Sequence, residues 1–213
     1  MTIGKPSTSI KPSRAEEKRL ANAGYQLIAG VDEAGRGALA GPVVAAAVIM
    51  PYPLDTPWLD QIRDSKLLGP TKRERLYHDI KRTAISVGIG TIPPEVIDSQ
   101  NIITATKLAM KQAIAQLSPA PEYLLIDHLL LPDIPPPQKG ITNGDRLCFS
   151  IACASIIAKV ARDRFMVQLD KIYPGYGLAQ HKGYGTREHL FHLRQRGPCP
   201  IHRQSFAPVR DVV

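Results

Sequence analysis

The sequence predicts an α/β domain built around a mixed β-sheet that is covered by helices on both faces. Nearly continuous apolar runs, typical of strands buried on two faces, alternate with segments of helical periodicity. The first two runs, residues 25–31 and 43–50, are too close together for a crossover helix, so we expect them to pair antiparallel. The alternation of strands and helices after them is typical of an α/β sheet. A mixed sheet is therefore expected.

The N-terminal half begins with a segment of low apolar content. Residues 1–20 are rich in Lys, Ser and Pro and are predicted to be a flexible tail, ending in a charged run able to start a helical turn. Residues 71–74 have the form of a capping box, and apolar residues at helical spacing follow them, which predicts a helix. Residues 85–92 resemble a strand, and Pro93-Pro94 opens a second helical region.

A short apolar strand is predicted at residues 123–126, and Asp127 follows it directly. The next connection, residues 129–144, is rich in proline and is expected to be irregular. Neither an internal repeat nor a second domain is visible. Residues 21–213 are therefore expected to form one domain.

The last third of the chain is predicted to be mostly helical. Residues 150–173 have the pattern of a long helix. Three small residues lie four positions apart along it, which favours close packing on a sheet: Ser150, Ala154 and Ala158. A loop rich in Gly, Tyr and His precedes a short helix at 186–196, which Gly197 is placed to end. The fold is thus expected to have a C-terminal helical segment.

The chain is basic, with a formal net charge of +8 and an isoelectric point of about 9.5. This charge suits binding to nucleic acid, where Lys and Arg displace counterions from phosphates, although many basic proteins have no such partner. The longest apolar run, residues 43–50, is far shorter than the roughly 20 residues that cross a bilayer. The polar N-terminus has no secretory signal, so a cytoplasmic protein without a membrane partner is expected.

Three cysteines, Cys148, Cys153 and Cys199, are an odd number without CxxC spacing. This pattern favours free thiols in a reducing compartment over a disulfide framework or a zinc site. Of the six histidines, His189 and His192 share a helix face but lack an HExxH frame, so a surface position is predicted for both.

Acidic residues follow two of the predicted strands. Asp32 and Glu33 come after the first strand and Asp127 after a later one, so a shared sheet edge is expected. Carboxylates held this close repel one another and need compensation, from Lys or Arg or from a divalent cation such as Mg²⁺ or Mn²⁺. Asp145, just ahead of the long helix, is placed to join them. The alternative is that each acid is a turn residue or a helix cap.

The glycines after these acids allow three interpretations. Residues 35–40 match a loose G-x-G-x-x-A dinucleotide fingerprint, but Gly41-Pro42 and an apolar run follow, leaving no room for the helix that this site needs. The glycines could instead let the main chain approach a sugar hydroxyl or a phosphate closely. The third interpretation is a hairpin turn without a ligand.

The stretch GVDEAGRGALAGPVVAAAV resembles the signature of ribonuclease HII, the bacterial type 2 ribonuclease H family. Further blocks in the same order look like those of the family: DSKLL at 64–68, ASIIAKVARDRFM at 154–166, HKGYGTREH at 181–189 and HRQSFAPV at 202–209. The resemblance covers residues 24–209. It implies an RNase H-like fold and a divalent-metal-dependent endonuclease. The implied substrates are the RNA strand of RNA/DNA hybrids and single ribonucleotides embedded in duplex DNA.

The resemblance also implies roles for particular residues. The metal ligands, and with them the catalytic residues, would be Asp32, Glu33, Asp127 and Asp145. The loop Gly35-Arg36-Gly37 would grip the 2′-hydroxyl of the ribonucleotide and the adjoining phosphate. Tyr184 would stack on the next deoxyribose on the 3′ side, and Lys66 would contact a backbone phosphate.

Four positions need separate comment. Ala38, His128 and Asn143 depart from the usual family pattern, and the role of His128 stays open. Asp163 lies far along the long helix, and we interpret it as part of a structural ion pair.

The chemistry implied is hydrolysis assisted by two divalent ions, Mn²⁺ or Mg²⁺, about 4 Å apart when substrate is bound. The cut would fall 5′ of the ribonucleotide and leave 5′-phosphate and 3′-hydroxyl ends. The related ribonuclease HIII family is a rival, but it carries an additional N-terminal domain and few residues precede the first strand here. The chain could also be a dinucleotide-binding oxidoreductase or a non-catalytic nucleic-acid-binding module. A monomer is expected, and no clamp-binding peptide for a sliding clamp is evident at the C-terminus.

Overall fold

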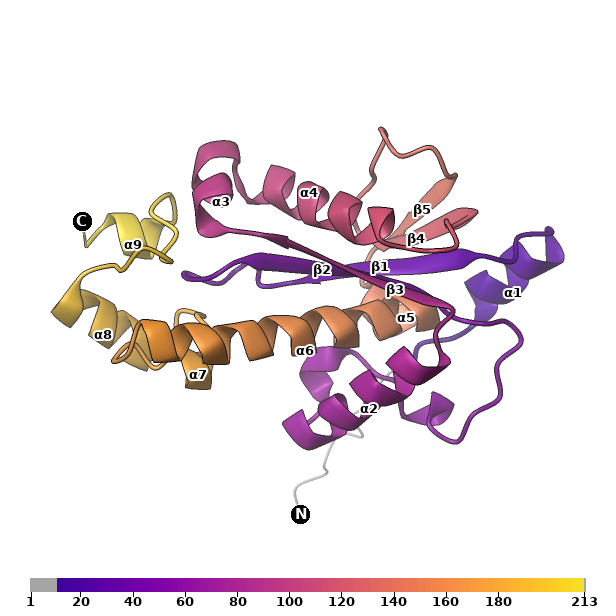
Figure 1. The fold of residues 1–213 in the computed structure, drawn as a ribbon, viewed down its shortest axis with the longest axis horizontal. Coiled ribbons are helices and arrows are strands. Elements are labelled where there is room, and N and C mark those ends of the chain that lie inside the picture. The colour runs from indigo at the N-terminus through magenta and orange to yellow at the C-terminus, as the bar shows by residue number, and fades with distance from the viewer. Residues whose placement is uncertain (1–10, 213) are drawn as a thin grey trace, which may run out of the picture.

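A five-stranded sheet forms the centre of the computed structural model, which describes residues 11–212 (Figure 1). Its strands are β1 (Ile28–Ala34), β2 (Val43–Ile49), β3 (Ser86–Ile92), β4 (Tyr123–Asp127) and β5 (Gln138–Ile141), in the order β3-β2-β1-β4-β5. The β1–β2 and β2–β3 pairs are antiparallel, whereas β1–β4 and β4–β5 are parallel. The predictions of a mixed sheet and of an antiparallel first pair are confirmed.

Helices cover both faces of this sheet (Figure 1). The long helix α6 (Phe149–Ile172) runs along one face, with α2 (Pro70–Thr83) on its outer side, and α4 (Ile102–Ala115) covers the other face beside α3 (Pro94–Gln100). The shorter helices are α1 (Ala15–Asn22), α5 (Gly144–Leu147), α7 (Leu178–His181), α8 (Arg187–Arg196), α9 (Ala207–Arg210) and the 3₁₀ turns Leu59–Gln61 and Ser65–Leu67. Among residues 11–212, no helix combines the length and apolar character needed to span a bilayer.

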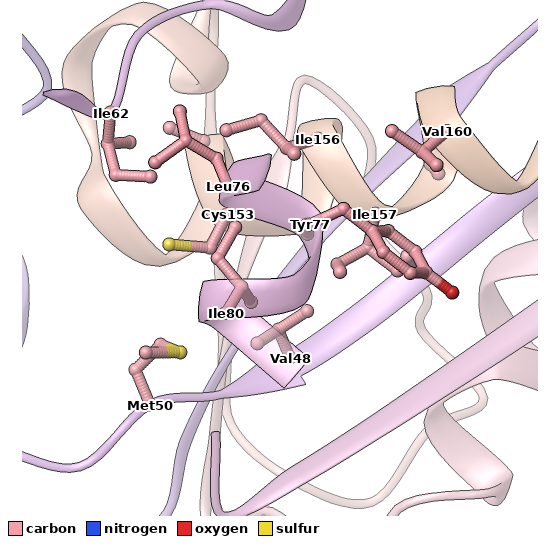
Figure 2. Close-up of a cluster of buried hydrophobic side chains, with 14 of the residues drawn as sticks. Val48, Met50, Ile62, Leu76, Tyr77, Ile80, Cys153, Ile156, Ile157 and Val160 are labelled. Atoms are coloured by element: carbon pink, nitrogen blue, oxygen red, sulfur yellow. The ribbon is translucent and has the colours of Figure 1, made fainter. Parts of the chain in front are cut away.

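The two largest apolar clusters of the core lie on opposite faces of the sheet. Alternate residues of β2 contribute to both clusters: Val48 faces α2 and α6, whereas Ile49 faces α4. Figure 2 shows the first cluster, in which Leu76 of α2 lies beside Ile156 of α6 and Ile80 of α2 lies beside Cys153 of α6. Because β2 is buried on both faces, its sequence is a continuous apolar run rather than an alternating one.

Helix α6 approaches the centre of the sheet closely where β1 has a glycine. A Cβ atom built on Gly30 would lie 2.1 Å from the carbonyl carbon of Ser150. The three small residues predicted to allow close packing, Ser150, Ala154 and Ala158, are all buried. This contact fixes α6 against β1, the strand that carries Asp32 and Glu33.

Replacing Gly30 with Ala is expected to destabilise the protein by about 3 kcal/mol or more, because backbone atoms on both sides must separate to admit the methyl group. Urea unfolding measures the change. Gly69→Ala is the matched control: nothing lies within 4 Å of a Cβ at Gly69, so its stability should stay within about 0.5 kcal/mol of the parent. Equal stabilities for the two variants would contradict this packing.

The predicted N-terminal tail needs correction over its second half. Helix α1 begins at Ala15, and its Leu20 is buried. Glu17 is also buried, and its carboxylate accepts a hydrogen bond of 2.8 Å from the backbone N–H of Ser150. Residues 15–20 therefore dock on the start of α6, while residues 1–10 lie outside the described part of the chain.

Two short elements lie in segments predicted to be irregular. Strand β5 occupies the end of the proline-rich connection, and the side chain of Gln138 closes the loop before it through hydrogen bonds to the backbone N–H and C=O of Leu131. Helix α7 lies in the loop at 174–185. The three cysteines are free thiols, as predicted.

Candidate active site

Three acidic side chains converge where β1 and β4 run side by side. The parallel register pairs Val31 with Ile126, so the residues that follow, Asp32 and Asp127, lie next to each other. One carboxylate oxygen from each of these acids and one from Glu33 all lie within 4.8 Å of one another. The prediction that these acids share one edge of the sheet is confirmed.

The protonation equilibria of these acids reflect their crowding. Burial, and then the charges of Glu33 and Asp127, raise the pKa of Asp32 well above its usual value. Burial also raises the pKa of Glu33, against the lowering effect of Arg36, whose Nη1 lies 3.3 Å from Glu33 Oε1. Each carboxylate is therefore costly to ionise without a further positive charge.

The site fits a divalent cation. Its donors are carboxylate oxygens, which are the ligands that Mg²⁺ and Mn²⁺ prefer. Glu33 Oε2 is buried and has no hydrogen-bond partner among the described residues. Among residues 11–212, Arg36 is the one basic residue that forms an ion pair with any of the three acids, so their combined negative charge is not fully neutralised.

Asp145 lies beside this group but is not one of the three. It sits in the short helix α5, is buried, and its Oδ2 lies 3.2 Å from Lys66 Nζ. The preceding residue, Gly144, donates its backbone N–H to Asp127 Oδ1 at 2.7 Å. Burial raises the pKa of Asp127, and the charge of Asp145 raises it further. Asp145 thus adds negative potential while Lys66 offsets part of it.

A cavity of about 480 Å³ adjoins the acids. Its wall includes all five residues predicted to bind substrate: Gly35, Arg36, Gly37, Lys66 and Tyr184. Glu33 also lines it, so the acidic group and the predicted substrate contacts share one space.

Four further polar residues of the wall were not singled out from the sequence: Ser65, Arg73, Ser155 and Lys159. Ser65 and Ser155 share a hydrogen bond of 2.9 Å between their hydroxyls. Arg73 and Lys159 both pair with Asp163, at 3.4 and 2.7 Å, which confirms Asp163 as part of a structural ion pair. The position of Ser65 within the DSKLL block was the available signal.

The two glycines of the loop have different surroundings. Gly35 has a φ of +95°, and a Cβ there would lie 2.0 Å from Arg162 Nε, so the fold itself requires glycine. Gly37 is exposed, and nothing lies within 4 Å of a Cβ built on it. Strand β2 begins at Val43, which leaves no helix for a dinucleotide site.

The surface position predicted for His189 is wrong. His189 is buried, and its Nδ1 donates to the carbonyl of Tyr184 at 3.0 Å. Its Nε2 lies 3.1 Å from Nε2 of buried His202, whose Nδ1 accepts the backbone N–H of Cys199 at 3.0 Å. These partners assign both rings as neutral, with the proton on Nε2 of His202 and on Nδ1 of His189. The sequence analysis missed this burial because the partner ring, that of His202, lies 13 residues further along the chain.

Histidine NMR should find His189 protonated on Nδ1 alone and titrating with a pKa of about 4, lowered first by burial. Because this pKa lies below the ordinary 6.5, the unfolded chain binds the proton first, and the stabilisation present above pH 6.5 is lost towards pH 4. An ordinary titration of His189 would contradict the assigned hydrogen bonds.

The model of the family described as "Ribonuclease HII" matches residues 29–209. A ribonuclease HII from Dehalococcoides mccartyi is 59% identical over 208 residues, which cover 98% of each chain. The crystal structure of ribonuclease H2 from Pyrococcus horikoshii is 25% identical, with a TM-score of 0.73 over 87% of this chain and 96% of that one. RNase HII from Archaeoglobus fulgidus, solved as a PCNA:RNase HII complex, is 26% identical with a TM-score of 0.69 over 84% and 95%.

These matches extend over the β1 acids, the cavity and the C-terminal segment alike, and the fold of the solved relatives is that of the chain described above. The chain therefore belongs to the ribonuclease HII family and is an endonuclease of the ribonuclease H class.

Proposed function

We propose that this enzyme hydrolyses the RNA strand of RNA/DNA hybrids and cuts on the 5′ side of single ribonucleotides in duplex DNA, leaving 5′-phosphate and 3′-hydroxyl ends. The observation that supports it is the convergence of Asp32, Glu33 and Asp127 beside a cavity walled by exposed glycine main chain. The carboxylates suit a divalent-metal site, and the bare main chain suits a test for one hydroxyl group.

Asp32, Glu33 and Asp127 would hold the divalent ions, with Asp145 as a fourth ligand once Lys66 releases it. Bound with substrate, two ions of Mn²⁺ or Mg²⁺ would neutralise the scissile phosphate, activate a water and assist the leaving oxygen. Burial raises the pKa of Asp32 and of Glu33, and a metal ion binds the ionised carboxylates. Metal binding should therefore tighten as the pH rises.

The cavity wall would supply recognition. Backbone groups at Gly37 would meet the 2′-hydroxyl, Tyr184 would stack on the deoxyribose 3′ of it, and Lys66 would contact a phosphate. All of these contacts are to sugar and phosphate groups, so cleavage is expected to show no preference for particular bases. The catalytic domain, expected over residues 21–213, would also include residues 15–20 of α1, and a sliding clamp is a candidate partner.

The test is incubation with a DNA duplex that carries one ribonucleotide, with and without Mn²⁺ or Mg²⁺, followed by mapping of the cut and its ends. We expect one metal-dependent cut 5′ of the ribonucleotide and none in the matched all-DNA duplex. A cut on the 3′ side, or cutting in excess chelator, would contradict the proposal. Binding without any cleavage would instead favour the non-catalytic module.

A further inference from the structure

Two arginine side chains are fully buried behind the glycine loop. Arg162 lies on α6 and Arg203 on the segment before α9, and both are 0% exposed. Neither guanidinium lies within 4 Å of a carboxylate oxygen of residues 11–212, whereas more exposed basic side chains of that range, such as Arg82 and Lys111, do form such ion pairs. A buried charge without a counter-charge is costly, so the pair needs an explanation.

Backbone carbonyls take the place of acids around both groups. Arg162 donates to Pro42 O at 2.9 Å, Ala40 O at 3.1 Å and Lys182 O at 2.9 Å. Arg203 donates twice to the carbonyl of residue 41, at 3.1 and 2.9 Å, and once to that of residue 36, at 2.8 Å. Each guanidinium nitrogen thus has an acceptor, and the bonds tie the glycine loop to the turn before Tyr184. The acids that act on the two charges, Asp163 on Arg162 and Asp98 on Arg203, do not form ion pairs with them.

Both charges lie directly behind the cavity wall. The Arg162 side chain is the group that a Cβ on Gly35 would strike, and its Cζ is 5.4 Å from the centroid of the Tyr184 ring. Burial, and then the charge of Arg162, lower the pKa of Arg203 to about 9. In this low-dielectric setting a charge acts over a longer distance than on the surface.

We propose that Arg162 and Arg203 are positioning residues whose unpaired charge is completed by a phosphate anion of the substrate, the one adjoining the ribonucleotide at the Gly35-Arg36-Gly37 loop. They hold the loop and the Tyr184 turn as one unit and give it a positive potential. The inference rests on the proposed function for the position of that phosphate, but it concerns binding rather than metal-dependent cleavage.

The test measures binding without divalent metal to two duplexes that differ at that linkage, one with the natural phosphate and one with a neutral methylphosphonate. Arg162→Gln and Arg203→Gln should each bind the natural duplex roughly tenfold more weakly, and the methylphosphonate duplex nearly as well as the parent does. Lys107→Gln, which removes one charge from α4 on the opposite face of the sheet, should leave the preference unchanged.

Equal weakening of both duplexes would mean that the arginines only brace the loop, and would overturn the proposal. The parent protein provides a second measurement if the Gln variants do not fold. Its affinity should fall roughly tenfold more for a methylphosphonate at this linkage than for one several nucleotides away. Equal losses of affinity at the two linkages would also overturn the proposal. If the binding preferences are as expected but the protein does not cleave, the result counts against the proposed catalytic function alone.

Discussion

Replacing Asp127 with Asn is expected to slow cleavage at an embedded ribonucleotide by about a thousandfold or more, while binding of the duplex stays within a few-fold of the parent. Asn keeps the size of the side chain and an oxygen that can accept the N–H of Gly144, but it loses the charge that a divalent ion requires. Single-turnover cleavage and metal-free binding measure the two effects separately. Stability should not fall, because one of three mutually repelling carboxylates is removed.

Asp133→Asn is the matched control, since Asp133 lies in the connection after the same strand but on the surface, in a pair with Lys111. Its cleavage rate should equal that of the parent, because an exposed pair of this kind contributes little. Near-normal cleavage by Asp127→Asn, or equal losses of cleavage and binding, would contradict the role proposed for the acid.

Replacing Gly37 with Ala should leave folding unchanged and lower kcat/KM by about a hundredfold. The new methyl group meets no protein atom within 4 Å, so it projects into the cavity where the 2′-hydroxyl and its phosphate are proposed to lie. Thermal unfolding and steady-state kinetics on the one-ribonucleotide duplex provide the two measurements.

Gly35→Ala is the informative contrast. Its φ of +95° and the 2.0 Å approach to Arg162 predict a stability loss of about 2–4 kcal/mol, with cleavage falling as a consequence. If Gly37→Ala cleaves as well as the parent, the exposed main chain does not contact the substrate closely.

The parts of the fold that the sequence predicted are those whose signal is local. Strand β2 and residues 28–31 of β1 are buried on both faces and have continuous apolar sequences, and the short link between the two strands dictated their antiparallel pairing. The convergence of Asp32 and Asp127 was predicted by placing both at strand ends; Asp127 does end β4, whereas β1 continues beyond Asp32 to Ala34. Asp145 was placed near them by its position ahead of the long helix and by the resemblance, and its pairing with Lys66 came from the structure.

The features that were missed depend on contacts between distant residues. Helix α1 is polar and is held by Glu17 at the start of α6, 133 residues away. The burial of His189 depends on His202, and two of the three carbonyl partners of Arg162 lie 120 and 122 residues before it. A polar side chain that is buried by such a partner carries no hydrophobic signal, so periodicity could not reveal it.

Two departures from the family pattern are backbone positions of a special kind. His128 and Asn143 have φ values of 59° and 57°, in the left-handed region that glycine and asparagine occupy most easily. Asn143 suits its position. His128 is held in this conformation by two backbone hydrogen bonds, from its own N–H to the carbonyl of Ile141 and from the N–H of Leu129 to the carbonyl of Asp127. Ala38 is fully buried, so a larger residue there would press on the loop that Arg162 and Arg203 support.

The most direct test of the account is to locate Mn²⁺ by its anomalous X-ray scattering in crystals of the protein with and without a one-ribonucleotide duplex. We predict manganese between the carboxylates of Asp32, Glu33 and Asp127, with its strongest occupancy when the duplex is bound. The account would be contradicted if manganese bound elsewhere in these crystals while protein recovered by dissolving them still cut the duplex.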